Sequence, residues 1–198
     1  MHQKFEEKLY ITISDNVSRK NIVTCANLIK NGIDFFNVAA NGGSKMMSNT
    51  VRLCRETAKH LGVEPPTILA VALLSSFGQR TLTEELNITL NTIEYVSKIA
   101  QIAKDSGVDG IVAAAGDSKK VKQELGQDFL VICPAVRPTW SVVNDQVRVV
   151  SPSDAINSGS DYMIIGRPIT SASDPKGAVQ MVIDEIENAL ENKEKEYI

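Results

Sequence analysis

Short apolar runs alternate with longer amphipathic stretches along the chain. The apolar runs cover residues 9–14, 33–39, 67–74, 109–114, 130–134 and 162–166. They are nearly continuous in Val, Ile, Leu and Ala, whereas a strand with one face in solvent alternates apolar and polar residues. The pattern therefore predicts six parallel strands that are covered on both faces.

The amphipathic stretches predict helices. They cover residues 17–31, 44–61 and 91–106, and a last helix starts at residue 174. Asn91, with Glu94 in the following turn, has the pattern of a capping box, and Asp174 stands before a proline that suits a first helical turn. Gly32 and Gly107 end the first and third of these helices.

Strands that alternate with helices form either a doubly wound sheet or a barrel. Neither familiar nucleotide loop, G-x-G-x-x-G after the first strand or G-x-x-x-x-G-K-[ST], occurs in the chain. Their absence favours an α/β fold like the TIM (β/α)8 barrel, incomplete because only about six βα units can be counted. No linker or low-complexity stretch divides the sequence, so we expect a single domain over residues 1–198.

Composition narrows the functional classes. The chain has 198 residues, of which 43% are hydrophobic and 23% charged, as is ordinary for a globular domain. Its net charge of −3 favours no nucleic-acid partner, and no run approaches the roughly 20 apolar residues of a membrane span. The N-terminus lacks the pattern of a secretory signal, and Cys25, Cys54 and Cys133 are too scattered for a zinc site or redox pair. We expect a cytoplasmic protein with reduced thiols and no metal.

The segment 161–178 follows the last predicted strand and favours an anion site. Gly166 has no Cβ, so its backbone N–H can approach an anion closely. Arg167 offers a guanidinium that matches the geometry of a phosphate. Barrels often bind phosphate in the loops after their last two strands. A plain turn at Gly166 with a surface ion pair at Arg167 is the alternative.

Two other strand ends carry polar side chains. Ser75 follows the third predicted strand, at the end where barrel active sites lie. The fifth strand leads into a connection that contains Arg137, Gln146 and Arg148. This connection exceeds the usual length of about 2–6 residues, and long loops in compact domains are often functional. A surface loop without function is the alternative.

Taken in order, these segments resemble the motifs of the orotidine 5'-phosphate decarboxylase family. That family has a strand and loop of the form D-x-x-V-H-A-x-G-G-x-x-M-M, an L-T-S strand end, a P-G-I-R-P loop, a D-Q-x-R element and a closing G-R-P-I-T-x-A-x-D-P. The corresponding segments here are 34–47, 74–76, 134–138, 145–148 and 166–175. The closing motif is the most specific, and the resemblance spans about residues 20–190.

The resemblance implies a set of substrate contacts. The hydroxyl of Ser75 would meet the pyrimidine, and Gln146 would bridge toward phosphate and base. Arg167 and the backbone of Gly166 would hold the phosphate, with Arg137 supporting that loop. We therefore expect a nucleotide monophosphate or another phosphorylated small molecule as the ligand, and no cofactor.

The catalytic element of the family is not found in the sequence. Family members decarboxylate through a D-x-K-x-x-D element on the third strand of their barrel, where the lysine protonates the carbanion. Counting back from the next strand puts this element at Ile11, Ile13 and Asn16, which carry neither an ammonium nor a carboxylate. Two further family residues, a histidine and a loop glycine, are replaced by Ala39 and Ala135. No catalytic residue is assigned, and the question whether the chain is an enzyme stays open.

The resemblance leaves two functional hypotheses. The first is an orotidine monophosphate decarboxylase of de novo pyrimidine synthesis that retains its phosphate-binding half while its catalytic half is degenerate. The second is a non-catalytic relative that binds a phosphorylated ligand. A phosphosugar barrel such as a hexulose-phosphate synthase is disfavoured, because it uses the same missing element. The family has two further βα units before the matching region, so we expect a homodimer or a complementing chain to cover the open sheet.

Overall fold

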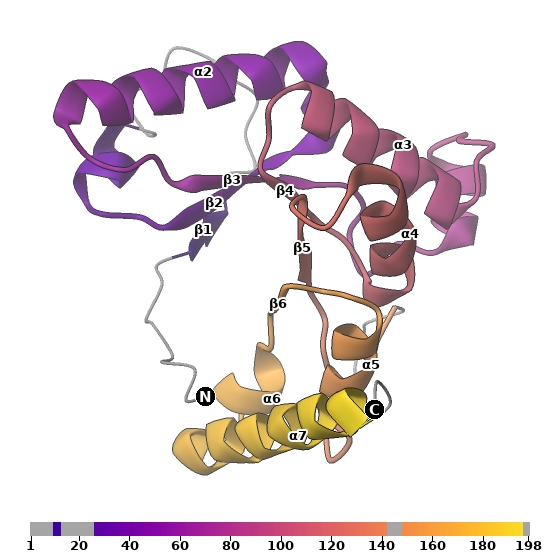
Figure 1. Ribbon diagram of the computed structural model, residues 1–198. Coiled ribbons are helices and arrows are strands. Elements are labelled where there is room, and N and C mark those ends of the chain that lie inside the picture. Colours follow the sequence, from indigo (N-terminus) through magenta and orange to yellow (C-terminus); the bar gives the residue numbers. More distant parts are fainter. Residues whose placement is uncertain (1–9, 13–25, 142–147, 196–198) are drawn as a thin grey trace.

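The computed structural model describes residues 10–12, 26–141 and 148–195. Its centre is a sheet of parallel strands in the order β1-β2-β3-β4-β5-β6, so β1 and β6 are the two edges (Figure 1). All six predicted strands are confirmed, and β2 to β6 are each shorter than the apolar run that predicted them. The strands are β1 (Tyr10–Thr12), β2 (Phe35–Ala39), β3 (Thr67–Val71), β4 (Gly110–Val112), β5 (Leu130–Cys133) and β6 (Tyr162–Met163).

The predicted helices over 44–61 and 91–106 and the last helix are confirmed as α2, α3 and α7. In α3, Asn91 Oδ1 accepts the N–H of Glu94 at 2.9 Å, and Glu94 Oε2 accepts the N–H of Asn91 at 3.0 Å, which is the expected capping box. Of the predicted helix over residues 17–31, residues 26–30 are helical, and residues 17–25 lie outside the described residues. The other elements are η1 (Ala40–Gly42), α2 (Ser44–Leu61), η2 (Thr81–Glu85), α3 (Thr92–Asp105), α4 (Ala115–Leu125), α5 (Pro152–Asn157), α6 (Arg167–Thr170) and α7 (Pro175–Lys195).

The apolar pattern does not predict α4 or α5. Helix α4 buries Asp117, Ser118 and Lys122 beside its few apolar residues, so no apolar stripe marks it in the sequence. Helix α5 has 6 residues, which is too short for a periodic pattern to stand out.

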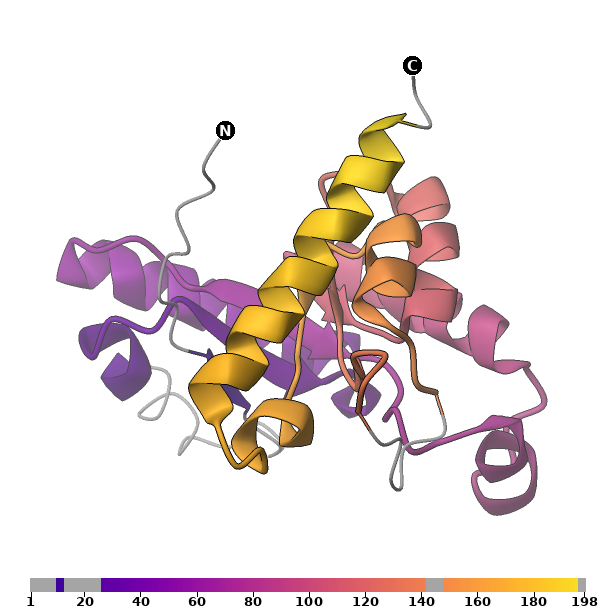
Figure 2. The ribbon, with the colours of Figure 1, turned by 90° about the horizontal axis from the view of Figure 1, so that it is seen from below.

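The sheet curves along its strand order, with α2, α3 and α4 on its outer side (Figure 1). Helix α7 packs against α5 and α6 beyond β6, and the second view shows the same neighbours (Figure 2). Helices outside a curved parallel sheet are the arrangement of a (β/α) barrel. None of the helices in the described ranges combines the length and the apolar character that a membrane crossing needs.

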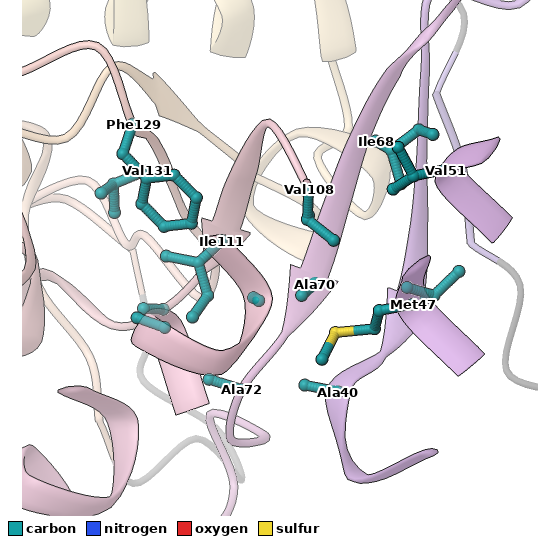
Figure 3. Packing of buried hydrophobic residues seen from close by; sticks show 14 of the residues in the cluster. Ala40, Met47, Val51, Ile68, Ala70, Ala72, Val108, Ile111, Phe129 and Val131 are labelled. Atoms are coloured by element: carbon teal, nitrogen blue, oxygen red, sulfur yellow. The ribbon is translucent and has the colours of Figure 1, made fainter. Parts of the chain in front are cut away.

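Two apolar clusters cover the two faces of the sheet. The outer cluster joins β3 to α2, where Ile68 lies near Val51 (Figure 3). The inner cluster consists of Phe35, Leu69, Val112 and Ile132, one residue from each of four neighbouring strands. Neighbouring residues of one strand therefore face opposite clusters, which explains why the strands are apolar throughout.

Candidate functional site

The predicted site residues follow the carboxyl ends of three strands. Because neighbouring strands are parallel, their carboxyl ends all lie at the same end of the sheet. Ser75 follows β3, Arg137 follows β5, and Gly166 and Arg167 follow β6. Gln146, the fifth predicted residue, lies outside the described residues.

Backbone hydrogen bonds join the end of β3 to the connection after β5. The N–H of Arg148 donates to the carbonyl of Ser75 at 3.3 Å. The N–H of Arg137 donates to the carbonyl of Val150 at 2.8 Å, and Val136 pairs with Val150 in a parallel bridge. The two ends of this connection therefore lie together beside Ser75.

A buried ion pair holds the second end of the connection in place. The guanidinium of Arg148 donates to the carboxylate of Asp117, in the first turn of α4. The side chain of Asp117 is 1% exposed and that of Arg148 15%. Burial raises the pKa of Asp117 above its usual value, while the charge and hydrogen bond of Arg148 oppose the rise. Sequence reasoning missed Asp117, whose only signal is an acidic residue shortly after a buried strand.

Arg137 is buried at the start of the same connection. It is 6% exposed, and its Nη1 donates to the carbonyl of Val136 at 3.2 Å. This placement suits a residue that supports the loop rather than one that reaches into solvent. Ala135, in the same turn, has a left-handed backbone with a φ of 59°. The position therefore has the backbone conformation that glycine adopts most easily.

Gly166 and Arg167 form an exposed corner where α6 begins. The carbonyl of Gly166 accepts the N–H groups of Ile169 and Thr170 at 2.9 and 3.0 Å, which fixes the turn that carries Arg167. A Cβ added to Gly166 would meet no heavy atom within 4 Å. The corner therefore has open space beside the backbone of Gly166, and the next residue, Arg167, is exposed.

The two described cysteines, Cys54 and Cys133, are buried, and Cys25 lies outside the described residues. Burial raises the pKa of the Cys133 thiol to about 11, so the thiol is protonated at neutral pH. Cys133 packs in a small apolar cluster with Ala115, Val136 and Ala155. Across residues 26–141 and 148–195, no three His, Cys, Asp or Glu side chains gather closely enough to hold a metal ion.

Comparison with known proteins identifies the family to which the chain belongs. A family model described as "Orotidine 5'-phosphate decarboxylase / HUMPS family" matches residues 19–182. The chain belongs to this family. It is 40% identical over 162 residues to the orotidine 5'-phosphate decarboxylase of Gloeothece citriformis, which covers 82% of this chain and 68% of that protein. It is 37% identical over 188 residues to the enzyme of Geobacter sulfurreducens, which covers 94% of this chain and 77% of that protein.

Solved structures of the decarboxylase family have the same fold. The crystal structure of orotidine 5'-phosphate decarboxylase from Lactobacillus acidophilus matches with a TM-score of 0.74 and 32% identity, over 90% of this chain and 75% of that chain. The decarboxylase from Pyrococcus horikoshii OT3 matches in fold alone, with a TM-score of 0.64 and 17% identity, over 91% of this chain and 74% of that one. Both the resemblance in the sequence and the incomplete TIM-barrel-like α/β fold are therefore confirmed.

Proposed function

We propose that this chain binds a nucleotide monophosphate at the carboxyl ends of β3, β5 and β6, as a member of the orotidine 5'-phosphate decarboxylase line of pyrimidine synthesis. The observation that carries the proposal is the exposed corner of Gly166 and Arg167, with open space beside the backbone. A guanidinium there can donate two hydrogen bonds to one phosphate. Family membership supports the same ligand class.

The other predicted contacts fit around this phosphate position. Ser75 is half-buried after β3, and its backbone carbonyl accepts the N–H of Arg148, so its backbone is fixed at the same end of the sheet. We assign the base of the nucleotide to Ser75 and the bridge between phosphate and base to Gln146, the latter on the family resemblance alone. Arg137, which is buried, supports the loop.

We further propose that the catalytic half of the site is degenerate. Removal of carbon dioxide without a cofactor needs fixed charge around the scissile carboxylate. The family's catalytic element would begin on the strand that contains Ile11, and the described part of that strand is β1. None of the three residues of β1, Tyr10–Thr12, is charged at neutral pH. Ile13 and Asn16 lie outside the described residues. A non-catalytic relative that only binds a phosphorylated ligand is the second candidate, and the same observation supports it.

Thermal unfolding with and without ligand tests the binding site. Uridine 5'-monophosphate at about a hundred times its Kd stabilises a one-site protein by about 2.7 kcal/mol. For a chain of this length, that corresponds to a rise in Tm of about 5–10 °C. Uridine, which lacks the phosphate, is expected to give almost no rise at the same concentration. Equal protection by both compounds would mean that the phosphate is not what the site holds.

Two arginine variants locate the binding. Arg167→Ala is expected to remove most of the protection by uridine 5'-monophosphate. Arg52→Ala is the matched control, because Arg52 lies on α2 and pairs with Glu56 in the same helix. If Arg167→Ala keeps the full protection, the phosphate site at the end of β6 is wrong.

A direct assay tests the degenerate catalytic half. The purified chain is incubated with orotidine 5'-monophosphate, and the loss of substrate absorbance is followed against a control without protein. We expect no turnover above that control. Measurable turnover would contradict the degenerate catalytic half and would leave the binding proposal standing.

We also propose that the chain associates with a second polypeptide, a further copy or a complementing chain, in the cytoplasm. Open sheet edges are prone to pair with another strand, which supports association. Buried thiols such as Cys54 and Cys133 suit a reducing compartment. Light scattering on the purified chain tests the association, since a stable monomer that keeps its fold would contradict it.

A further inference from the structure

Arg148 contacts the carboxyl ends of two strands at once. Its N–H donates to the carbonyl of Ser75, which follows β3, and its guanidinium donates to Asp117, which follows β4 in the first turn of α4. Two residues further on, Val150 pairs with Val136, which follows β5. Because β3, β4 and β5 are neighbours in the sheet, one short segment joins three consecutive strand ends (Figure 1).

Two of these strand ends carry residues of the proposed ligand site. Ser75 is assigned to the base, and the N–H of Arg148 reaches its carbonyl at 3.3 Å. Arg137 supports the loop, and its N–H donates to the carbonyl of Val150 at 2.8 Å. Both hydrogen bonds depend on the path of the backbone from residue 148 to residue 150. A displacement of Arg148 would therefore change the support of both site residues.

The carboxylate of Asp117 fixes this path. The side chain of Asp117 is 1% exposed, and its N–H donates to the carbonyl of Ala114 at 2.9 Å within the first turn of α4, so the carboxylate has a defined place at the end of β4. The side chain of Arg148, which is 15% exposed, reaches this carboxylate from the connection after β5. Separation of a buried ion pair leaves an uncompensated charge, which is costly. The pair therefore anchors the connection to α4.

The pair is poorly suited to a role in stability alone. Asp117 Oδ1 and Arg148 Nη1 are both buried without a hydrogen-bond partner in the described part of the chain, whereas a bidentate pair would use both atoms. Apolar residues of similar volume often replace a buried ion pair at no cost in stability. Apolar side chains do not supply a directed hydrogen bond, which is what determines where Arg148 lies.

We propose that Asp117 is a positioning residue of the nucleotide site. Through Arg148 it fixes the backbone of Ser75 and of the connection after β5, and it thereby sets the affinity for the base of the ligand. The inference rests on the proposed function for the identity of that ligand. Asp117 does not itself touch the ligand, because its side chain is buried. The phosphate is assigned to Gly166 and Arg167 after β6, which have no printed bond to this pair and are expected to act independently of it.

Another ion pair on α4 provides the control. Lys122 is 5% exposed and pairs with Asp161 at 2.7 Å. Asp161 directly precedes β6 and accepts the N–H of Val131, near the start of β5, at 2.6 Å. This pair therefore lies at the amino end of the sheet, whereas Asp117 lies at the carboxyl end. Its loss is expected to lower stability and to leave the ligand site unchanged.

Hydrogen exchange without ligand tests the anchor itself. In Asp117→Asn, the amide protons of Arg137 and Arg148 are expected to exchange about tenfold faster, beyond any change at a core amide such as that of Leu69, because local opening becomes easier. Lys122→Met should not change these two protons relative to Leu69. Unchanged relative exchange in Asp117→Asn would overturn the proposal.

Calorimetric titration with two ligands tests the effect on the site. Uridine 5'-monophosphate carries the base and the phosphate, whereas ribose 5-phosphate lacks the base. Asp117→Asn is expected to bind uridine 5'-monophosphate about tenfold more weakly, because the base contact is no longer preorganised, and to bind ribose 5-phosphate almost as before. Lys122→Met is expected to bind both ligands like the unaltered chain. An equal loss for both ligands would contradict a role at the base.

A stable variant separates positioning from stability. Asp117→Leu combined with Arg148→Met removes both charges and fills the buried space, so we expect it to keep the Tm of the unaltered chain. A pair needed only for stability would leave binding intact in this variant. The positioning role instead predicts a loss of affinity for uridine 5'-monophosphate of about tenfold, as in Asp117→Asn. Full affinity in the double variant would overturn the proposal.

Failure of the proposed function has a different signature. If the unaltered chain binds neither uridine 5'-monophosphate nor ribose 5-phosphate, the proposed function is wrong, while faster exchange at Arg137 and Arg148 in Asp117→Asn still supports the anchor. If the unaltered chain binds both ligands and the Asp117 variants bind them equally well, the ligand site stands and the positioning role is wrong.

Discussion

The rings of Phe35 and Tyr162 meet edge to face, with their centroids 5.3 Å apart and their planes at 69°. Three strands, β3, β4 and β5, lie between the strands that carry them. In a flat sheet, four strand spacings would separate the two backbones by about 19 Å. The contact therefore measures the curvature that makes this sheet a barrel wall rather than an open layer.

The first prediction is that Phe35 and Tyr162 are energetically coupled. Aromatic pairs in edge-to-face contact contribute about 0.5–1.5 kcal/mol beyond the area that they bury. A double-mutant cycle with Phe35→Leu and Tyr162→Leu, measured by urea unfolding, is expected to give a coupling of that size. The same cycle with Tyr95→Leu in place of Tyr162→Leu should give almost none, because Tyr95 packs against the outer cluster. Equal coupling in both cycles would mean that the sheet is flatter in solution.

The second prediction concerns the buried pair of Asp117 and Arg148. Arg148→Met leaves the carboxylate buried without its cation, which costs about 3–5 kcal/mol at neutral pH. The usual pKa of the Asp117 side chain is 3.8, burial already raises it in the folded protein, and loss of Arg148 raises it further. The folded state then binds the proton more tightly than the unfolded state, so stability falls as pH rises from about 3.8 through the raised pKa. Urea unfolding is expected to show a smaller cost of Arg148→Met near pH 4 than at pH 7.

The matched control for this pair replaces both charges. Asp117→Leu combined with Arg148→Met removes the buried carboxylate as well as its cation, and such replacements are often neutral or stabilising. We expect the double variant to recover most of the lost free energy of unfolding and to lose the pH dependence. A cost of Arg148→Met that is the same at both pH values would show that the loss of Arg148 does not change the protonation of Asp117 in the folded protein.

The strands could be predicted because their burial on both faces produces a continuous run of apolar residues in the sequence. Ile68 and Leu69 face opposite clusters, so both had to be apolar, and the run reveals the strand. Helix α4 could not be predicted in this way, because its buried side carries Lys122. This lysine forms an ion pair with Asp161, which lies 39 positions further along the chain. A local pattern carries no information on a partner that only the folded sheet brings near.

The same distinction holds for the site. Gly166 and Arg167 are neighbours in sequence and in space, so a motif could identify them. Asp117 and Arg148 are separated by 31 positions and meet only because β4 and β5 are adjacent and the connection after β5 turns back. The structure therefore shows this ion pair, and no local motif in the sequence predicts it.

The third prediction is that Gly110 cannot be replaced without loss of stability. A Cβ at this position would lie 2.5 Å from the carbonyl oxygen of Leu130 and 2.6 Å from its Cβ. These contacts involve the backbone of the neighbouring strand, so β4 and β5 would have to move apart. Gly110→Ala is expected to cost about 3 kcal/mol in urea unfolding, at the upper end of the cost of overpacking.

Gly116 provides the control for this glycine. It lies in α4, is exposed, and has no heavy atom within 4 Å of an added Cβ. Gly116→Ala is expected to stabilise the protein by about 0.5–1 kcal/mol, because alanine favours a helix. Similar effects of the two substitutions would mean that β4 and β5 are not as close as described.

The fourth prediction is that Ala135→Gly stabilises the chain. Ala135 has a φ of 59°, a left-handed conformation that costs an L-residue about 1–2 kcal/mol. Glycine removes that cost, while the greater freedom of the unfolded chain takes back about 0.4–1 kcal/mol. We expect a net gain of about 0.5–1 kcal/mol and a rise in Tm of a few degrees, measured by calorimetry. Ala135→Val is the opposing control, since a β-branched side chain at positive φ is strained, and its Tm should fall. A fall in Tm with glycine would show that the turn after β5 has another backbone in solution, and that Arg137 is held differently.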